Sequence, residues 1–521
     1  MKKILSILLA AVLMLSMTAC QKEEKKPMAD PVDDNYRTMY QIFVGSFSDS
    51  NNDGIGDLRG IINRLDYLND GNINSGDSLG VQGIWLSPIF KSPSYHKYDA
   101  SDYYEIDWRF GSEEDLKELI EKCHERNMIV ILDLAINHTS KNHAWFQAFR
   151  QARIDGDTAN PYYDFYSCVT TAEKQGGISY QKLAAGVDCW YECNFSGDMP
   201  ELNYNNPAVK QAMLDVAAYY LNLGVDGFRF DAVKYIYYGD TSKNVAFWTW
   251  YMSELQRIKP DIYCVGECWS GESEILEYYP AMNCFNFAMA TAEGTVASAA
   301  KGFSISKYTR YIESLQSSIL AKNPNGMVMG FLSNHDMDRI AGSFVTENQM
   351  RMAANLYLLA PGSPVIYYGE EIGLRGSRGG ENTDANRRLA MRWGDDDLVR
   401  DPQGATYPDG KQISTTVADQ EKDENSLLCY YQKLIAIRHK YPAIARGTYT
   451  AIDCGEKNFG GFRVTYEGQT IGIFHNNGTE EISYDISAYG FTKLADFIGV
   501  SGASLKGNIL TLGPQTSAIV Q

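Results

Sequence analysis

Residues 224–235 read Gly-Val-Asp-Gly-Phe-Arg-Phe-Asp-Ala-Val-Lys-Tyr, and this stretch decides the fold. Val225 to Phe230 is apolar enough for a buried strand. Arg229 and Asp231 end that strand on one face, because side chains two residues apart in a strand point the same way. A guanidinium beside a carboxylate keeps the carboxylate ionised and fixes its direction, as a nucleophilic Asp requires. A structural ion pair at the end of a strand is the alternative interpretation.

Three further segments repeat this pattern of an apolar run that leads to an acidic residue. Glu267 follows Asp231 after 36 residues, and Asp336 follows after a further 69. One βα unit takes roughly 30 to 40 residues, so these spacings correspond to one unit and then two. Parallel strands with polar groups at their carboxyl ends, alternating with helices, are typical of a (β/α)8 barrel with its site on that face. The three segments are Met128–His138, Asp261–Glu267 and Met327–Asp336.

The sequence therefore predicts an α/β fold, a (β/α)8 TIM barrel with an inserted subdomain after strand 3 and a C-terminal antiparallel β domain. The insertion is indicated by Asp133, which precedes Asp231 by 98 residues, more than one unit requires. From about Gly447, short alternating runs separated by Gly and Asn are typical of antiparallel strands. We expect a signal peptide at 1–19, a tether at 20–35, the barrel at 36–138 and 206–445, the inserted domain at 139–205 and a C-terminal β-sandwich at 446–521.

Periodicity assigns the strands and helices of this barrel. Tyr40–Val44 and Gly83–Leu86 suit the first two strands, and Pro364–Glu371 suits the eighth strand with its loop. Ser112 is followed by three acidic residues, which is typical of a helix N-cap and first turn. Helices are predicted at Ser112–Arg126, Trp248–Lys259, Ser306–Ala321 and Leu427–Lys440.

The first 35 residues indicate export. Met1–Ala19 has two lysines and an apolar run that is too short for a permanent membrane span and is flanked like a secretion signal. The small residues before Cys20 resemble a bacterial lipobox, which implies lipidation of Cys20; cleavage that leaves an unmodified cysteine is the alternative. We expect secretion across the cytoplasmic membrane and lipid anchoring to the bacterial cell envelope. Gln21–Asp34 is charged and contains Pro, as expected of a tether.

The composition narrows the class of partner. The 521 residues carry 47 basic and 65 acidic side chains, a net charge of −18, which argues against nucleic acid and against an electrostatic membrane patch. Membrane contact is therefore expected through the lipid alone, and a neutral polymer is the easier partner. Nine cysteines remain after Cys20. Cys189 and Cys193 lie close enough to pair, but their spacing does not demand it, and mostly buried thiols are expected.

Short motifs in these segments resemble those of a known family. The chain contains Asp-Leu-Ala-Ile-Asn-His at 133–138, Gly-Phe-Arg-Phe-Asp-Ala-Val-Lys-Tyr at 227–235, Val-Gly-Glu-Cys-Trp at 265–269 and Phe-Leu-Ser-Asn-His-Asp at 331–336. In this order they resemble the signature regions of the α-amylase family, glycoside hydrolase family 13. Met199–Asn203 resembles a fifth motif, at the end of that family's inserted domain. The resemblance runs from about Tyr36 to the C-terminus and implies an α-glucan substrate.

Glycoside hydrolysis needs one carboxylate at the anomeric carbon and one protonated acid for the leaving oxygen. Asp231 beside Arg229 has the environment of the ionised group, whereas the apolar neighbours of Glu267 should raise its pKa. The resemblance likewise implies Asp231 as nucleophile, Glu267 as acid/base and Asp336 as the carboxylate that grips sugar hydroxyls. We expect a retaining mechanism with the first two carboxyls roughly 5 to 6 Å apart.

The resemblance also implies a set of substrate-binding residues. Tyr98 can lie against a sugar ring, and histidines near strand ends can bind its hydroxyls. The alternative interpretation is that these side chains pack the loops or satisfy structural hydrogen bonds. The set is His96, Tyr98, Asp99, His138, Arg229, Lys234 and His335.

One loop has the composition of a calcium site. Between residues 49 and 57 oxygen side chains recur at nearly every second position, although the twelfth-position Glu of an EF-hand is missing. Family members that act on oligosaccharides bind a metal here. The resemblance implies a Ca²⁺ site formed by Asp49, Asn51, Asp53, the Ile55 carbonyl and Asp57; an Asx-rich turn without metal is the alternative.

A second calcium, at Asn137, is doubtful. Glu201 and Tyr235 stand where many calcium-dependent members of the family carry Asp and His. One calcium is therefore the expected content.

Bond preference rests on few residues. Ala232 stands where members that act on α-1,6 bonds often have Val, and Lys234 keeps the amylase-like pattern; both favour α-1,4 bonds. We expect a monomeric, lipid-anchored α-amylase that hydrolyses starch and maltooligosaccharides internally. Met199–Asn203 resembles neopullulanases and cyclomaltodextrinases, so these, or an oligosaccharide α-glucosidase, are the alternatives. An inactive starch-binding protein is the non-enzyme alternative, against which the presence of all three acids argues.

Overall fold

The computed structural model describes residues 34–72, 75–379 and 384–521. Seven strands form one sheet in the order β11-β10-β9-β5-β2-β1-β12, and every neighbouring pair is parallel. The strands are β1 (Met39–Ile42), β2 (Gly83–Leu86), β5 (Ile129–Leu134), β9 (Gly227–Phe230), β10 (Tyr263–Gly266), β11 (Asn283–Cys284) and β12 (Val365–Tyr367).

A short extended segment at Met329–Phe331 closes this sheet into a barrel. Met329 pairs in parallel with Phe285, next to β11, and Phe331 pairs in parallel with Val365 of β12. The segment therefore takes the place of a strand between the two edges. The (β/α)8 barrel is thereby confirmed.

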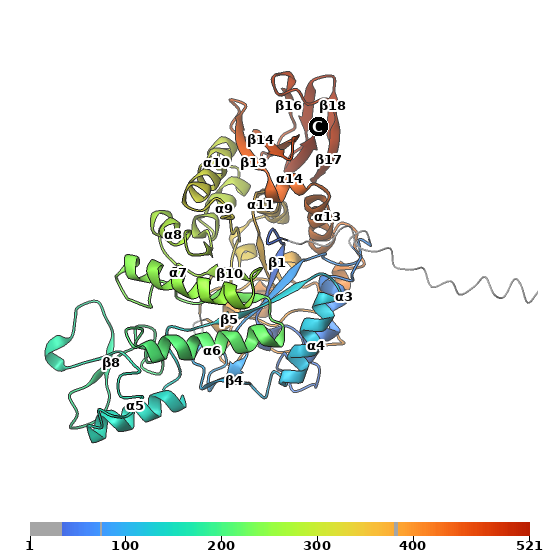
Figure 1. Ribbon diagram of the computed structural model, residues 1–521. Helices are drawn as coiled ribbons and strands as arrows, with labels where there is room; N and C mark the ends of the chain where they lie inside the picture. The colour runs from blue at the N-terminus through green and yellow to red at the C-terminus, as the bar shows by residue number, and fades with distance from the viewer. Residues whose placement is uncertain (1–33, 73–74, 380–383) are drawn as a thin grey trace, which may run out of the picture.

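β1, β2, β9 and β10 are buried along their whole length, because helices cover the sheet (Figure 1). α4 follows a capping box in which Ser112 accepts the N–H of Asp115, and α13 has the predicted bounds. α7 begins seven residues before the predicted Trp248, because Asp240 caps it by accepting the N–H of Lys243. The main helices are α2 (Leu58–Asn63), α3 (Leu65–Leu68), α4 (Glu113–His124), α6 (Pro207–Leu223), α7 (Thr241–Ile258), α8 (Glu272–Tyr278), α9 (Thr295–Ala300), α10 (Ile305–Lys322), α11 (Glu347–Leu358), α13 (Leu427–Lys440) and α14 (Pro442–Arg446).

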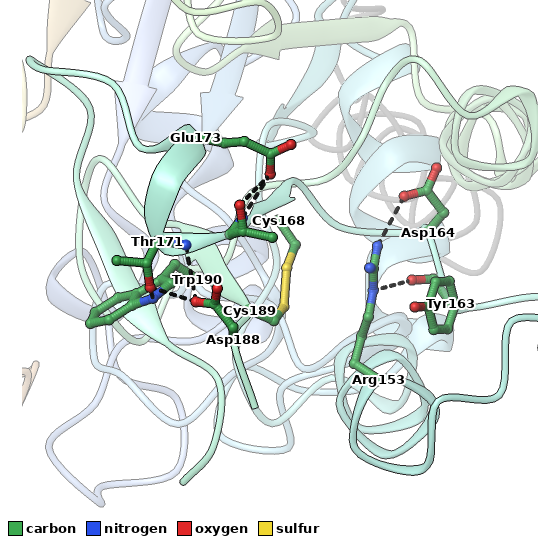
Figure 2. The surroundings of a disulfide bond; sticks show 10 residues. Arg153, Tyr163, Asp164, Cys168, Thr171, Glu173, Asp188, Cys189 and Trp190 are labelled. Carbon is green, nitrogen blue, oxygen red and sulfur yellow. Dashed lines mark hydrogen bonds and ion pairs between the residues drawn. A yellow bond between two sulfur atoms is a disulfide. The ribbon is translucent and has the colours of Figure 1, made fainter. Parts of the chain in front are cut away.

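The inserted segment between β5 and α6 projects from one end of the molecule (Figure 1). It contains α5 (Ala144–Asp155) and an antiparallel sheet of β6 (Cys168–Val169), β8 (Trp190–Glu192) and β7 (Tyr180–Lys182). A disulfide joins Cys168 to Cys189 and fastens β6 to the start of β8 (Figure 2). The pair that the sequence suggested, Cys189 with Cys193, is therefore wrong: Cys189 bonds to Cys168, and Cys193 is a buried thiol.

The C-terminal β domain lies at the other end of the molecule, against α10 and α14 (Figure 1). Two antiparallel sheets share a buried core that includes Phe459, Phe474, Leu510 and Leu512. The first sheet has the order β13 (Thr448–Asp453), β14 (Phe459–Tyr466), β15 (Gln469–Asn476), β20 (Thr516–Val520), β17 (Leu494–Gly499). The second has the order β16 (Ile482–Asp485), β19 (Ile509–Leu512), β18 (Ala503–Lys506).

The predicted signal peptide, Cys20 and nearly all of the tether lie outside the described residues. Across the parts of the chain that are described, no helix has both the length and the apolar character to cross a membrane. At the start of the described chain, Asp34 forms an ion pair with Arg446 at 2.6 Å, which ties it to the last barrel helix.

Candidate active site

Three acidic residues meet at the carboxyl end of the barrel. Asp231 follows β9 directly, Glu267 follows β10 directly, and Asp336 lies five residues beyond Phe331. Asp231 and Glu267 are 8% and 9% exposed, so each has only a small opening to solvent. The barrel strands thus bring together the acids that the sequence places far apart.

Arg229 is at the centre of this arrangement. Its Nη1 donates to Asp133 Oδ1 and to Asp231 Oδ1, each at 2.7 Å, and its Nη2 lies 3.4 Å from Glu267 Oε2. Burial would lower the pKa of Arg229, but the surrounding carboxyl groups hold it well above its usual range. One fixed cation is therefore shared by three carboxyl groups.

Glu267 is the member of this group that carries a proton at neutral pH. Burial raises the pKa of Glu267 to about 8; Arg229 opposes the shift, and the negative charges of Asp231 and Asp336 add to it. A carboxyl group with this pKa can donate its proton near neutrality and recover it later. The raised pKa and the burial of Glu267 support its predicted role as the acid/base.

Asp336 has the opposite character. Burial opposes its ionisation, but His335 and Arg388 hold the pKa of Asp336 well below its usual range. His335 Nε2 lies 2.9 Å from Asp336 Oδ2, and Arg388 Nη2 donates to Oδ1 at 2.7 Å. Sequence reasoning missed Arg388, which comes from an irregular segment; the Arg387-Arg388 pair was its only signal.

His138 presents a free nitrogen to the site. It is 1% exposed, and its Nε2 has no hydrogen-bond partner among the described residues. Burial lowers the pKa of His138, so the ring is neutral and can accept or donate one hydrogen bond at this atom. A sugar hydroxyl would satisfy it.

Tyr98 and His335 already have partners within the protein. The Tyr98 hydroxyl lies 2.6 Å from His335 Nε2 and donates to Asp133 at 2.7 Å. His335 Nδ1 lies 2.7 Å from the Gln41 amide nitrogen. The two rings stack with centroids 5.4 Å apart. Direct contact between His335 and a sugar stays a prediction, whereas the structure shows the contact of His335 with Asp336.

The remaining predicted residues brace the loops of the site. Asp99 is buried and accepts hydrogen bonds from the Ser92 and Ser94 hydroxyls. Burial, with the charge of Arg388, lowers the pKa of His96 to about 4. Lys234 donates to the Trp269 carbonyl at 2.7 Å and so joins the loops after β9 and β10.

Phe195, Tyr235 and Tyr238 form a line of rings that leads away from His138, here called the aromatic row. Phe195 comes from the inserted segment and contacts His138, with centroids 5.3 Å apart. Tyr235 follows at 4.7 Å and Tyr238 at a further 5.2 Å. Phe195 and Tyr238 are 45% and 43% exposed. A cavity of about 470 Å³, lined in part by Asp336 and Trp269, opens onto the site.

Comparison with known proteins identifies the architecture. A family model for the α-amylase catalytic domain matches residues 41–447. The chain belongs to the α-amylase family, glycoside hydrolase family 13. It is 35% identical over 488 residues to Alpha-amylase 3 of Dictyoglomus thermophilum, covering 92% of each chain. It is 31% identical over 462 residues to a 4-alpha-glucanotransferase of Thermotoga maritima, covering 86% of this chain and 97% of that one.

A solved structure of the same family has a matching fold. Eubacterium rectale Amy13B superposes with a TM-score of 0.87 at 35% identity, over 95% of this chain and 99% of that one. This amylase-family protein is therefore similar to its relatives over the barrel, the inserted segment and the C-terminal domain together.

The predicted calcium loop of this amylase-family protein is a chain of Asx turns. Asp49 accepts the N–H groups of Asn51, Asn52 and Gly54, and Asp53 accepts that of Ile55. The described residues contain no group of three or more His, Cys, Asp or Glu side chains arranged to hold a metal. The donors nevertheless fit a calcium ion in chemistry, since all are carboxylate, amide or carbonyl oxygens, each of which has more than one lone pair.

Glu201, at the predicted second calcium position, is buried and bonded within the protein. Burial, together with the charge of Glu192, raises the pKa of Glu201 to about 8, so Glu201 is protonated at neutral pH. Its Oε1 accepts the N–H of Asn194 at 2.9 Å. Glu201 is thus bonded to the backbone of the inserted segment, and the expectation of a single calcium stays a prediction.

Proposed function

We propose that this amylase-family protein hydrolyses α-1,4-glucosidic bonds within starch and maltooligosaccharides by a retaining mechanism. One observation carries the proposal: Arg229 touches both Asp231 and Glu267, yet it lies 2.7 Å from the first and 3.4 Å from the second. Asp231 thus has the shorter ion pair with the guanidinium, and burial keeps a proton on Glu267. A nucleophile and a protonated acid side by side are what a retaining glycosidase needs.

The two chemical steps use these residues in turn. In the first step, Asp231 forms a bond to the anomeric carbon while Glu267 gives its proton to the departing glycosidic oxygen. In the second step, Glu267 takes a proton from water, the water oxygen attacks the same carbon, and the bond to Asp231 breaks. Asp336 stays ionised and can accept hydrogen bonds from sugar hydroxyls. His138 Nε2 is available to the same sugar.

Internal cleavage of a long chain is supported by the aromatic row. Phe195 and Tyr238 are the exposed rings of this row, with the half-buried Tyr235 between them, and each can offer an apolar surface to a sugar ring beyond the bond that is cleaved. Ala232 and Lys234 favour α-1,4 bonds, as does the similarity to a relative named as an α-amylase.

A glucanotransferase is the second candidate. The relative from Thermotoga maritima carries that name, and the aromatic row would equally hold a sugar acceptor. In that case a sugar hydroxyl, in place of water, would give its proton to Glu267 in the second step.

Product analysis distinguishes the candidates. A soluble form that begins at Asp30 would be incubated with amylose, pullulan and β-cyclodextrin, with Asp231→Asn as the inactive control. Rapid shortening of amylose to mixed maltooligosaccharides, with little action on the other two, is the expected result. Panose from pullulan or faster opening of β-cyclodextrin would establish a neopullulanase-like enzyme. Longer products without new reducing ends would establish a transferase, and glucose alone an α-glucosidase.

We further propose one bound calcium and a lipid anchor. Asp49, Asn51, Asp53, the Ile55 carbonyl and Asp57 would hold the ion, which would fasten the loop ahead of α2. Chelation should then lower the melting temperature (Tm) of the parent protein, and Asp53→Ala, which removes one exposed ligand, should abolish that response. Cys20→Ser should release an otherwise membrane-bound, monomeric protein from the cell envelope.

A further inference from the structure

Ala232, the residue after the proposed nucleophile, has an unusual backbone conformation. Its φ is 52°, in the left-handed region that residues with a Cβ atom rarely occupy. It is 3% exposed, so the conformation is fixed by surrounding protein. Such outliers persist where the surrounding structure enforces them, and they are concentrated at functional sites.

The turn that contains Ala232 holds Glu267 in two ways. The Ala232 N–H donates to Glu267 Oε2 at 3.1 Å, and the Val233 N–H donates to the Glu267 carbonyl at 3.1 Å. The Glu267 N–H in turn donates to the Phe230 carbonyl at 2.9 Å. The backbone that follows β9 therefore fixes both the main chain and the side chain of the proposed acid/base.

The two side-chain oxygens of Glu267 therefore differ in their hydrogen-bond surroundings. Oε2 receives the Ala232 N–H and faces Arg229 Nη2 at 3.4 Å, so it lies among donors. Oε1 has no hydrogen-bond partner in the described part of the chain. A proton placed on Oε2 would point at an N–H and a guanidinium, whereas a proton on Oε1 meets neither.

We propose that Ala232 is a positioning residue: its backbone N–H reserves Oε2 of Glu267 as an acceptor, so that Oε1 carries the proton that moves to the leaving oxygen. The inference rests on the proposed function of Glu267. In the first step the Oε1–H bond breaks and the glycosidic oxygen gains that proton. In the second step the proton from water returns to Oε1. Oε2 keeps its bond to Ala232 through both steps.

The charges around Glu267 agree with this assignment. Arg229 and the Ala232 N–H both lower the pKa of Glu267, and Asp231 and Asp336 raise it. Tyr235 and Cys268 also face Glu267, and burial raises the pKa of each, Cys268 to about 12, so neither is charged at neutral pH. Without the Ala232 N–H, one of the two donors that favour the ionised form is lost, and the pKa of Glu267 should rise.

The first test uses the unaltered protein. Neutron diffraction from deuterated crystals at pH 6 should show deuterium on Oε1 of Glu267. Deuterium on Oε2 would overturn the proposal. This measurement requires no variant, so a failure of any variant to fold does not affect it.

The second test removes one hydrogen-bond donor, the N–H of Ala232. Replacing Ala232 by L-lactic acid through nonsense suppression changes its N–H to an ester oxygen, and Ala232→Gly is the control that keeps the N–H and suits a positive φ. The ester variant should lose about tenfold or more in kcat on maltoheptaose, and the alkaline limb of its pH profile should move to higher pH. It should lose much less on an aryl maltoside with a good leaving group, which needs little proton donation.

The outcomes separate the two proposals. If the ester variant has its alkaline limb at the same pH as the parent and Ala232→Gly, the proposed role of Ala232 is overturned. If Asp231→Asn and Glu267→Gln instead cleave α-glucan as fast as the parent does, the proposed function itself is overturned.

Discussion

At the scale of single residues, Arg229 sets the charge of the site. It is fully buried and lies at equal distance from Asp133 and Asp231, so the proposed nucleophile, Asp231, shares this cation with a second carboxyl group. Burial raises the pKa of Asp133 to about 6, and Tyr98 and Trp85 donate to that carboxyl group as well. Removing Arg229 would leave buried carboxylates without a countercharge, which costs far more than one ion pair contributes.

The pKa of Glu267 predicts the alkaline limb of activity. Because Glu267 must be protonated to assist the departing sugar, kcat/KM on maltooligosaccharides should reach a plateau on the acid side of about pH 8 and fall above it. Glu267→Gln cannot donate this proton, so its kcat should be lower by about 10² to 10⁴, with no limb near pH 8. Initial rates from pH 5 to 10 check both statements.

Glu370→Gln is the matched control for this measurement. Burial also raises the pKa of Glu370 to about 8, but this residue bonds to Tyr357 and Tyr431 away from the site. It should leave the pH profile of kcat/KM unchanged. If the alkaline limb moves in Glu370→Gln, or is still present in Glu267→Gln, then a group other than Glu267 is responsible for it.

At this scale the sequence could indicate the acids but not all their partners. Asp231, Glu267 and Asp336 each end an apolar run at a spacing set by the βα unit, which is a regular signal. Arg388 and Ala232 have no such signal. Arg388 reaches Asp336 from an irregular segment, and the left-handed backbone of Ala232 depends on contacts with the neighbouring strand.

At the scale of elements, the site is built where the inserted segment meets the loop after β9. Phe195 lies three residues beyond β8 and fits between His138 and Tyr235. The position of Phe195 therefore depends on how firmly the inserted segment is held, and the Cys168–Cys189 disulfide fixes the strand that leads to it.

Phe195→Ala should weaken the binding of long substrates. Loss of one ring of the aromatic row removes a stacking surface worth about 0.5 to 1.5 kcal/mol, or roughly 3- to 10-fold in affinity. KM for amylose should rise by this factor, whereas kcat on a short aryl maltoside should change little. Steady-state kinetics on both substrates check whether the loss is confined to KM for amylose.

Phe303→Ala is the control, since Phe303 is also exposed but lies between α9 and α10, beside the C-terminal domain. It should have parent kinetics on both substrates. Equal losses on amylose and on the aryl maltoside in Phe195→Ala would show a folding defect rather than a lost sugar contact.

Reduction of the Cys168–Cys189 disulfide should loosen the inserted segment without unfolding the barrel. The bridge spans 21 residues, and closing a loop of this size contributes about 3 kcal/mol in the chain-entropy account. The exposed stretch 171–177 should then be cut faster by a protease. Mass spectrometry of early fragments, with Cys193→Ser as a control that keeps the bridge, measures this. Equal cutting before and after reduction would show that local packing holds the segment without the bridge.

The elements were predictable where their signal was local. β2 and α13 have their predicted bounds, because apolar periodicity and capping are encoded within each segment. The disulfide partner was not predictable, since Cys168 and Cys189 meet only after β6 and β8 pair. The start of α7 was missed because a cap at Asp240, rather than the apolar pattern, determines it.

At the scale of the whole molecule, the barrel separates two regions with different tasks. The inserted segment lies at the end that supplies Phe195, and the C-terminal β domain lies at the far end (Figure 1). The sequence located the segment that closes the barrel, within Met327–Asp336, but not that its pairing would be limited to the single bridges of Met329 and Phe331. The number of strands could be predicted, because acid spacing counts βα units regardless of how long each strand is.

The barrel also buries acidic residues that take no part in the proposed chemistry, and these predict how the stability of the whole molecule depends on pH. Glu370 has an ordinary pKa of 4.5 that burial raises to about 8. Between these values the folded protein holds a proton that the unfolded chain releases. Stability therefore falls as pH rises through this window, and the contribution is fully present only below about pH 4.5.

Glu370→Gln should remove this dependence, because an amide keeps the oxygen that accepts from Tyr357 and Tyr431 and cannot ionise. Its Tm should equal that of the parent near pH 5 and exceed it by about 1 to 3 °C at pH 8.5. Thermal scans at one fixed rate across this range measure the difference, with the exposed Glu121→Gln as a control that follows the parent. A Tm for Glu370→Gln below that of the parent at pH 8.5 would mean that the ionised carboxylate stabilises the fold, through a partner such as Arg339, and that its burial is not the dominant cost.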